Sequence, residues 1–181
     1  MTPLQKKAIA VAIASAIAIP AEGLRRTFYY DPPGILTVCY GSTTNVSKTK
    51  TYSLAECKAL LDQDMLIAVN AVDRCVPGLP VKVLAAFSDA VYNIGPKIAC
   101  NTTTSTAARL LKIGNYEAAC KQLPRWNKAR IAGFMVSLPG LTKRRAAEMK
   151  LCLTPDPVTR PTTALVHYSW TEPKNEQRIA A

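Results

Sequence analysis

The sequence predicts an α+β fold that is mainly helical, with a small β-hairpin lobe and a helical lobe joined by a long helix. Two short runs rich in β-forming residues, 35–40 and 48–52, flank the turn-forming residues 41–45. From residue 54 to residue 153, apolar residues recur at helical spacing. This division leaves a groove between the lobes that can accept an extended polymer.

The long helix has the best-defined start. Ser53 is a predicted N-cap, and Glu56, three residues later, completes a capping box. The helix should end near the turn at residues 76–78. Before the hairpin, we expect a short helix over residues 24–28.

The helical lobe is predicted from several apolar-periodic segments separated by Gly, Asn or Pro. Gly95-Pro96, Gly114-Asn115 and Pro124 mark three of the boundaries. The expected helices cover residues 81–94, 105–113, 116–123 and 142–153. No strand is expected within this lobe.

The last segment, 154–181, has a different composition. It contains four prolines and is mostly polar, so we expect a flexible extension. Its Tyr168 and Trp170 are predicted to be solvated, and its His167, the only histidine, is not expected to be catalytic.

Length and charge limit the classes of function. The 181 residues suffice for one well-buried domain, and a 49% hydrophobic composition argues against general disorder. The formal charge of +11 favours a polyanionic partner, such as nucleic acid, anionic lipid or the bacterial envelope. Because zinc-finger spacing and helix-turn-helix or RNA-binding signatures are lacking, a nucleic-acid partner is not expected.

Glu22, Asp31 and Thr37 are the candidate catalytic residues, at offsets of nine and six positions. Cleavage of a glycosidic bond requires one protonated carboxyl group and one ionised carboxylate. Glu22 follows an apolar run, which suits the protonated role. Asp31 precedes a Pro-Pro-Gly turn, whose backbone N–H groups and surrounding water suit the ionised role.

This stretch resembles the active-site segment of the T4-type phage lysozymes, glycoside hydrolase family 24. The family pattern is Glu, eight residues, Asp or Cys, five residues, Thr, and both spacings hold here. The flanking Tyr-Tyr-Asp and Thr-Val-Cys-Tyr-Gly sequences also match, and less specific similarity continues to about residue 153. The resemblance implies a lysozyme-like fold over residues 22–153.

The resemblance also implies a mechanism. Glu22 would be the general acid, Asp31 the base or electrostatic partner, and Thr37 would hold the attacking water. The reaction would invert the sugar configuration and need no metal or organic cofactor. Ser42 is a departure, because many relatives carry histidine there; we expect activity to survive this change.

The N-terminal segment, 1–21, reads as an export signal or signal-anchor. Lys6 and Lys7 precede twelve uncharged residues, too few for a firmly held span of about 20. The segment is either cleaved after Ala18 or retained as an anchor that is later released, as in signal-anchor-release endolysins. We favour retention, because cleavage would remove the residues just before Glu22. The protein would then reside in the host inner membrane and become active in the periplasm.

Six dispersed cysteines indicate disulfides in an oxidising compartment rather than a metal site. Six cysteines allow 15 pairings, so the pattern alone does not choose among them. Shorter relatives of similar layout lack counterparts of Cys75 and Cys100, and the resemblance therefore favours a bond between these two. For the other four cysteines, buried free thiols remain an alternative.

The sequence thus predicts a monomeric phage endolysin that hydrolyses the β-1,4 bond between N-acetylmuramic acid and N-acetylglucosamine in peptidoglycan. One alternative is a lytic transglycosylase, which uses one catalytic carboxylate. The other is a basic, non-enzymatic protein that disrupts the envelope. Trp126 is expected to pack in the core. For Arg125, Arg144 and Arg145, internal ion pairs and contacts with anionic polymers are equally expected.

Overall fold

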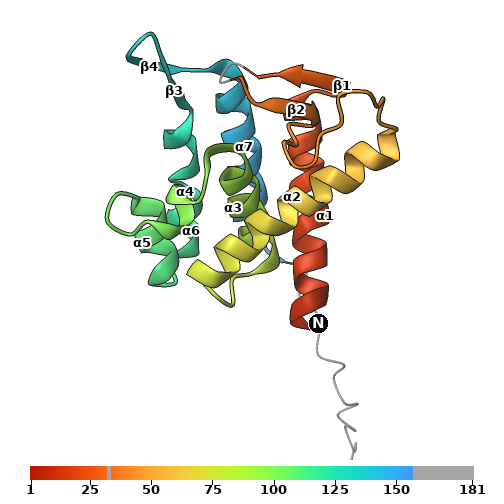
Figure 1. Cartoon of the computed structure of the whole chain (residues 1–181). Coiled ribbons are helices and arrows are strands. Elements are labelled where there is room, and N and C mark those ends of the chain that lie inside the picture. Colours follow the sequence, from red (N-terminus) through yellow and green to blue (C-terminus); the bar gives the residue numbers. More distant parts are fainter. Residues whose placement is uncertain (32–33, 157–181) are drawn as a thin grey trace, which may run out of the picture.

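The computed structural model describes residues 1–31 and 34–156. The predicted mainly helical α+β class is confirmed (Figure 1). In chain order the elements are α1 (Pro3–Glu22), β1 (Arg25–Tyr30), β2 (Leu36–Cys39), α2 (Leu54–Cys75), α3 (Val81–Ile94), α4 (Lys97–Cys100), α5 (Thr106–Lys112), α6 (Tyr116–Cys120), η1 (Leu123–Trp126), β3 (Lys128–Ile131), β4 (Phe134–Ser137) and α7 (Pro139–Leu153).

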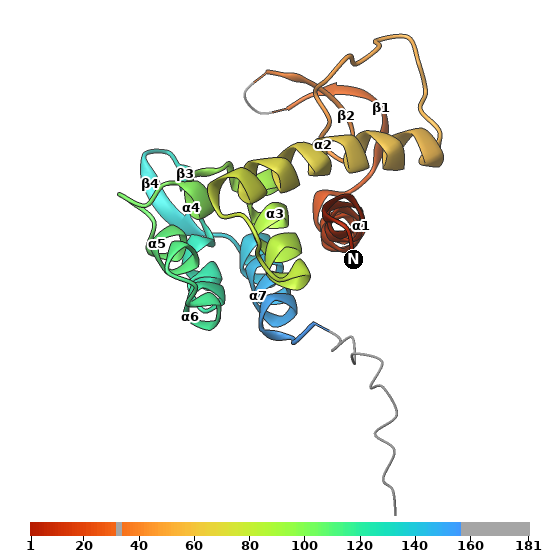
Figure 2. The ribbon, with the colours of Figure 1, turned by 90° about the horizontal axis from the view of Figure 1, so that it is seen from below.

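The long helix α2 connects the two lobes as predicted. Ser53 accepts a hydrogen bond from the Glu56 N–H, and the Glu56 side chain accepts one from the Ser53 N–H, so the capping box is confirmed. Figure 2 shows the β1–β2 hairpin on one side of α2 and helices α3 to α7 on the other. The helix ends at Cys75, just before the predicted turn.

The β-hairpin lobe matches the prediction in one strand and differs in the other: the run 35–40 forms β2, but its partner is β1 rather than residues 48–52. Residues 25–30, expected to be helical in part, form β1, which pairs antiparallel with β2. The sequence Thr-Phe-Tyr-Tyr at residues 27–30 is rich in β-forming side chains, and pairing with β2 overrides the helical reading. Residues 48–52 form no strand; the Tyr52 N–H donates one bond to Arg26 O, at 2.8 Å.

A second hairpin, β3–β4, interrupts the lobe that was expected to be wholly helical. Four pairs in continuous register, from Lys128 with Ser137 to Ile131 with Phe134, define it. Ala132 and Gly133 form its turn with φ of 47° and 88°. A two-residue turn with positive φ matches the twist of paired strands, which explains why this segment leaves the helical state.

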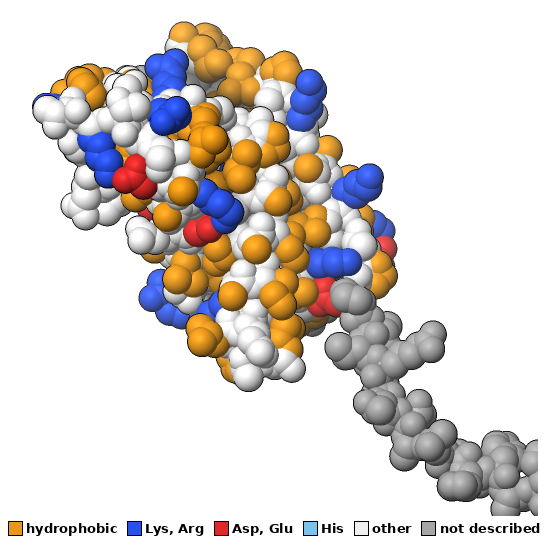
Figure 3. All heavy atoms as spheres, turned by 90° about the vertical axis from the view of Figure 1, so that its right-hand side faces the viewer, with side chains coloured by type: hydrophobic (Ala, Val, Ile, Leu, Met, Phe, Trp, Pro, Cys, Tyr) orange, Lys and Arg blue, Asp and Glu red, His pale blue; other side chains and the backbone are white. Residues whose placement is uncertain are grey.

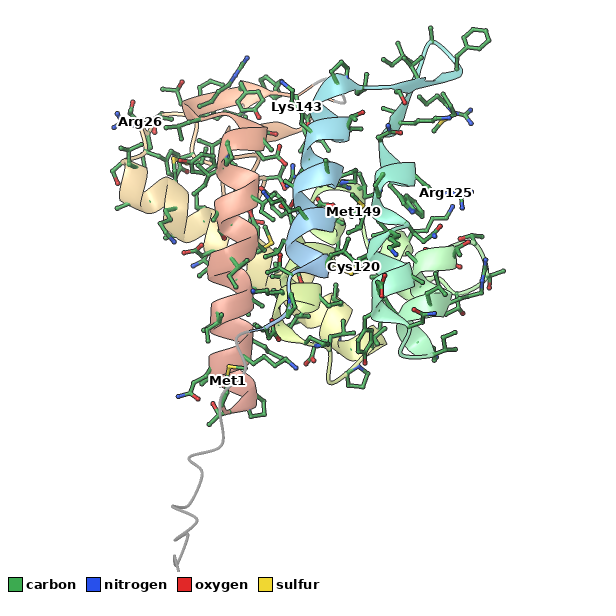
Figure 4. All side chains as sticks on the ribbon, turned by 180° about the vertical axis from the view of Figure 1, so that it is seen from behind. Met1, Arg26, Cys120, Arg125, Lys143 and Met149 are labelled. Carbon is green, nitrogen blue, oxygen red and sulfur yellow. A yellow bond between two sulfur atoms is a disulfide. The ribbon has the colours of Figure 1, made fainter. Side chains whose placement is uncertain are left out.

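Helix α1 packs into the same hydrophobic core as the helical lobe. Ala10, Ala14 and Ala18 are fully buried in the cluster that also contains residues of α2, α3 and α7. Small side chains on one face let the backbone of α1 approach its neighbours closely. Viewed from behind, α1 and α7 lie side by side and run in opposite directions, with Met1 and Lys143 at opposite ends (Figure 4).

All six cysteines are in disulfides. The predicted Cys75–Cys100 bond is present, and it ties the end of α2 to α4. The free-thiol alternative for the other four is wrong, because Cys39 bonds Cys57 and Cys120 bonds Cys152.

The C-terminal segment is described only to Asp156. The Asp156 carboxylate accepts bonds from the backbone N–H groups of Val81 and Lys82, at 2.8 and 3.2 Å, and so caps the start of α3. Residues 157–181, including His167, Tyr168 and Trp170, lie outside the described residues, and the expected flexibility of the extension stays a prediction.

Candidate active site

Glu22 is the last residue of α1, and its carboxylate is held by Arg144 of α7. Arg144 Nη1 donates to Glu22 Oε1. The same guanidinium binds Asp89 of α3 through two parallel bonds, Nε to Oδ2 at 3.0 Å and Nη2 to Oδ1 at 2.7 Å. Arg144 is 5% exposed and Asp89 is fully buried. Asp89 thus binds the Nε and Nη2 side of the guanidinium, and Nη1 is left to bind Glu22.

Arg144 keeps its charge in this buried position. Burial lowers the pKa of Arg144, but the hydrogen bonds and charges of Asp89 and Glu22 outweigh burial and raise it above its ordinary value. A buried cation with two carboxylate partners is compensated, whereas one left alone would be strongly unfavourable.

Glu22 also lies against the chain that leaves β2. A Cβ atom added to Gly41 would lie 4.0 Å from Glu22 Oε2 and 3.5 Å from the Tyr92 hydroxyl. Tyr92 donates its hydroxyl proton to the Tyr40 carbonyl at 2.7 Å. Burial, and next the negative charge of Glu22, raise the pKa of Tyr92, so its hydroxyl stays protonated. This bond joins the hairpin lobe to α3 beside Glu22.

Asp31 and Thr37 are brought together on the β1–β2 hairpin through Ile35. The Ile35 N–H donates to Asp31 Oδ1 at 2.7 Å, and the Thr37 hydroxyl donates to the Ile35 carbonyl at 3.0 Å. Asp31 follows the end of β1, while Thr37 pairs with Tyr29 across the hairpin and is only 3% exposed. As predicted, a backbone N–H of the turn binds the Asp31 carboxylate.

The structure therefore arranges the three candidate residues in two groups. Asp31 and Thr37 share the hairpin, and Glu22 lies at the end of α1 against residue 41, which follows the hairpin. A pocket of about 300 Å³ borders the Glu22 end of α1. Its lining residues come from α1 and α7: Ile17, Pro20, Ala21, Gly140, Lys143, Arg144 and Ala147.

A second group of buried ionisable residues lies next to Arg144. Arg145 donates a hydrogen bond to Glu148, both are fully buried, and Arg145 also donates to Asn93 at 3.2 Å. Burial raises the pKa of Glu148 to about 10, and the neighbouring Asp89 carboxylate adds to the rise. Glu148 Oε1 lies 3.8 Å from Arg144 Nε, which links this group to Arg144.

Ser42, the residue that departs from the family pattern, is 2% exposed, and its hydroxyl makes no hydrogen bond of normal geometry with the described residues. Asp64 of α2 is an acidic neighbour of Ser42. Burial raises the pKa of Asp64, while the Ser42 hydroxyl acts in the opposite direction.

The sequence did not single out Asp89, and it left Arg144 and Arg145 undecided. Both arginines form internal ion pairs, so that alternative holds for them. Arg125 is exposed and donates to Gln122 at 3.1 Å. Trp126 packs against the core as expected. A signal for Asp89 was available, since it is the one acidic residue on the apolar helix 81–94.

Across residues 1–31 and 34–156, no group of three His, Cys, Asp or Glu side chains is placed to hold a metal ion. Lys and Arg side chains are spread over the face in Figure 3 rather than gathered in one patch, and acidic side chains are few there.

Comparison with known proteins identifies the family. The family model described as phage lysozyme matches residues 20–148. The chain belongs to the phage lysozyme family. It is therefore a glycoside hydrolase of the lysozyme type, as the sequence predicted.

Relatives named SAR-endolysin match 84% of this chain. A protein named SAR-endolysin from Bacteriophage PS119 is 35% identical over 168 residues, which is 84% of this chain and 96% of the relative. Another SAR-endolysin, from Pseudomonas phage phiKMV, is 36% identical over 157 residues, 84% of this chain and 92% of the relative.

Solved structures confirm the lysozyme-like fold. The muramidase domain of SpmX from Asticaccaulis excentricus has a TM-score of 0.69 and 28% identity, covering 81% of this chain and 95% of that domain. The endolysin from Escherichia coli O157:H7 phage FAHEc1 has a TM-score of 0.65 and 26% identity, covering 78% of this chain and 90% of its own.

Proposed function

We propose that this phage lysozyme is an endolysin that hydrolyses the β-1,4 bond between N-acetylmuramic acid and N-acetylglucosamine and so lyses the host cell. The observation that carries this function is the fixed position of Glu22. Arg144 binds its Oε1, while Oε2 lies near Gly41 beside the strand that carries Thr37. The relatives named SAR-endolysin and the muramidase-domain structure support the same substrate.

In this mechanism Glu22 keeps its bond to Arg144 through Oε1, takes up a proton on Oε2, and donates that proton to the leaving oxygen. Asp31, held by the Ile35 N–H, acts as the base toward water. Thr37 holds that water on the hairpin. The sugar configuration is inverted, and no metal ion takes part in any of these steps.

Two isosteric substitutions test the proposed roles on purified peptidoglycan. Glu22→Gln and Asp31→Asn should each lower the hydrolysis rate by about 100-fold or more. Glu117→Gln is the matched control, because Glu117 is exposed and pairs only with Lys121 among the described residues. Retained activity in Asp31→Asn, with an anhydro product, would support a lytic transglycosylase. Killing that persists in Glu22→Gln would support envelope disruption by charge.

Residues 1–21 are proposed to anchor the enzyme in the host inner membrane before it acts. Among the described residues, α1 is the helix long and apolar enough to cross a bilayer, with a mean hydropathy of 1.4. While α1 is embedded, Glu22 stays at the membrane surface and Arg144 lacks this partner. Release lets α1 pack into the core and complete the site in residues 22–153. The active form is proposed to be a periplasmic monomer.

Activity on purified peptidoglycan tests this control. Protein reconstituted in bilayers should be much less active than released, detergent-free protein at equal concentration. Equal specific activity in the two forms would contradict the proposed anchoring control while leaving the roles of Glu22 and Asp31 untouched.

A further inference from the structure

The apolar face of α1 gives this helix no unique position along its own axis. The fully buried Ala10, Ala14 and Ala18 are spaced four residues apart, and Ile9, Ile13 and Ile17 repeat at the same interval. One helical turn is about 5.4 Å. A shift by one turn in either direction puts alanine back in two of the three buried positions and brings Lys6 or Glu22 into the third. The apolar contacts alone therefore discriminate weakly between neighbouring registers of α1, and its charged and polar side chains supply most of the discrimination.

Polar side chains of α1 make contacts that do depend on register. Lys7 Nζ lies 2.9 Å from Asp73 Oδ2 and donates to Asn70 Oδ1 at 3.0 Å. Two turns further on, the Ser15 hydroxyl donates to Asp62 Oδ1 at 2.9 Å. All three partners lie on α2, whereas Glu22 finds its partner on α7.

A one-turn shift would break these contacts together. Position 15 would receive Val11 or Ile19, and the half-buried Asp62 would face an apolar side chain instead of a hydroxyl donor. Position 7 would receive Pro3 or Val11, which leaves Asp73 without its cation. The same shift would move Glu22 by about 5.4 Å and out of reach of Arg144. Registers that are similar in apolar packing thus differ in polar contacts.

We infer that Lys7 and Ser15 are positioning residues, which set the register of α1 so that Glu22 meets Arg144. This inference rests on the proposed catalytic role of Glu22. Each residue acts through α1 rather than on the substrate, since both lie far along the helix from Glu22. A single polar residue that specifies the register of packed helices is a known use of such groups.

Two neighbouring lysines provide a matched test in the released, full-length protein. Lys7→Met and Lys6→Met remove the same charge, but the structure gives Lys6 no ion pair with the described residues. Lys7→Met should lower kcat on solubilised glycan strands about two- to tenfold, with KM little changed, and Ser15→Ala should add to the loss. Lys6→Met and the conservative Lys7→Arg should stay near the parent value.

Amide hydrogen exchange provides a readout that does not depend on catalysis. In Lys7→Met, the amides of α1 should exchange faster than in Lys6→Met, because the docked register is less stable. Equal kcat and equal exchange in the two variants would overturn the inference. If Glu22→Gln kept full activity, the proposed function would fail, while the exchange difference would still decide the role of Lys7.

Discussion

Glu22 and Arg144 form an ion pair across 122 positions of the chain, and this pair joins the end of the first helix to the last helix. The pair is continued inward by Asp89, which binds Arg144 through two hydrogen bonds. The candidate acid is therefore positioned by tertiary structure and not by its neighbours in sequence.

Removal of Arg144 should impair both stability and activity. Arg144→Met leaves the buried Asp89 without a cation, a change that typically costs about 3–5 kcal/mol. It also frees the Glu22 carboxylate, so the hydrolysis rate should fall further than the folded fraction explains. Urea denaturation and rate measurements at low temperature separate the two effects. Lys150→Met, at an exposed position near the other end of α7, is the control and should be nearly neutral.

Enlarging a buried alanine of α1 should prevent this helix from docking. Ala14 is fully buried, and the extra volume of Ala14→Leu should cost about 1–3 kcal/mol through overpacking. Ala16→Leu adds the same apolar volume on the exposed side of α1. The thermal unfolding temperature and the rate of peptidoglycan hydrolysis should both fall in Ala14→Leu and stay near the parent values in Ala16→Leu. Similar behaviour of the two variants would contradict the observed packing of α1.

Stability should decrease as the pH rises, because of Glu148. Burial, and then the neighbouring Asp89 carboxylate, raise its pKa to about 10 in the folded protein, from 4.5 for the unconstrained group. The folded state therefore holds a proton that the unfolded state loses above about pH 4.5, and this stability is lost as the pH rises through about 10. Denaturation curves should show a smaller pH dependence in Glu148→Gln. Glu117→Gln, an exposed site, should keep the parent slope.

Two of the disulfides should differ in their effect on activity. Removing Cys75–Cys100 by a double serine substitution should cost about 2–4 kcal/mol, but activity well below the unfolding temperature should remain. Removing Cys39–Cys57 should lower activity as well, because this bond attaches the β1–β2 hairpin to α2. That hairpin carries both Asp31 and Thr37. Unchanged activity after loss of Cys39–Cys57 would argue against the hairpin's role.

The parts of the fold that local sequence determines were predicted correctly. The Ser53 and Glu56 capping box places the start of α2, and Gly95 ends α3 with a φ of 84°. These features depend on residues three or four positions apart. Family resemblance supplied the candidate residues, because an acidic pair nine positions apart is weak evidence alone.

The features that depend on distant partners were not predicted. Residues 25–30 become a strand only because β2 lies beside them. The β3–β4 hairpin depends on a tight turn at Ala132 and Gly133, which interrupts a sequence otherwise compatible with helix. Asp89 is buried because Arg144, 55 positions later, compensates its charge. Periodicity along one segment contains no information about such pairings.

The three disulfides have a consequence for the proposed release of α1 from the membrane. They bridge β2 to α2, α2 to α4, and α6 to α7, and none of them includes α1. Every covalent cross-link can thus form while the first helix is still elsewhere. Arrival of that helix then requires no thiol exchange, and the remaining step is a reversible docking governed by side-chain packing and charge.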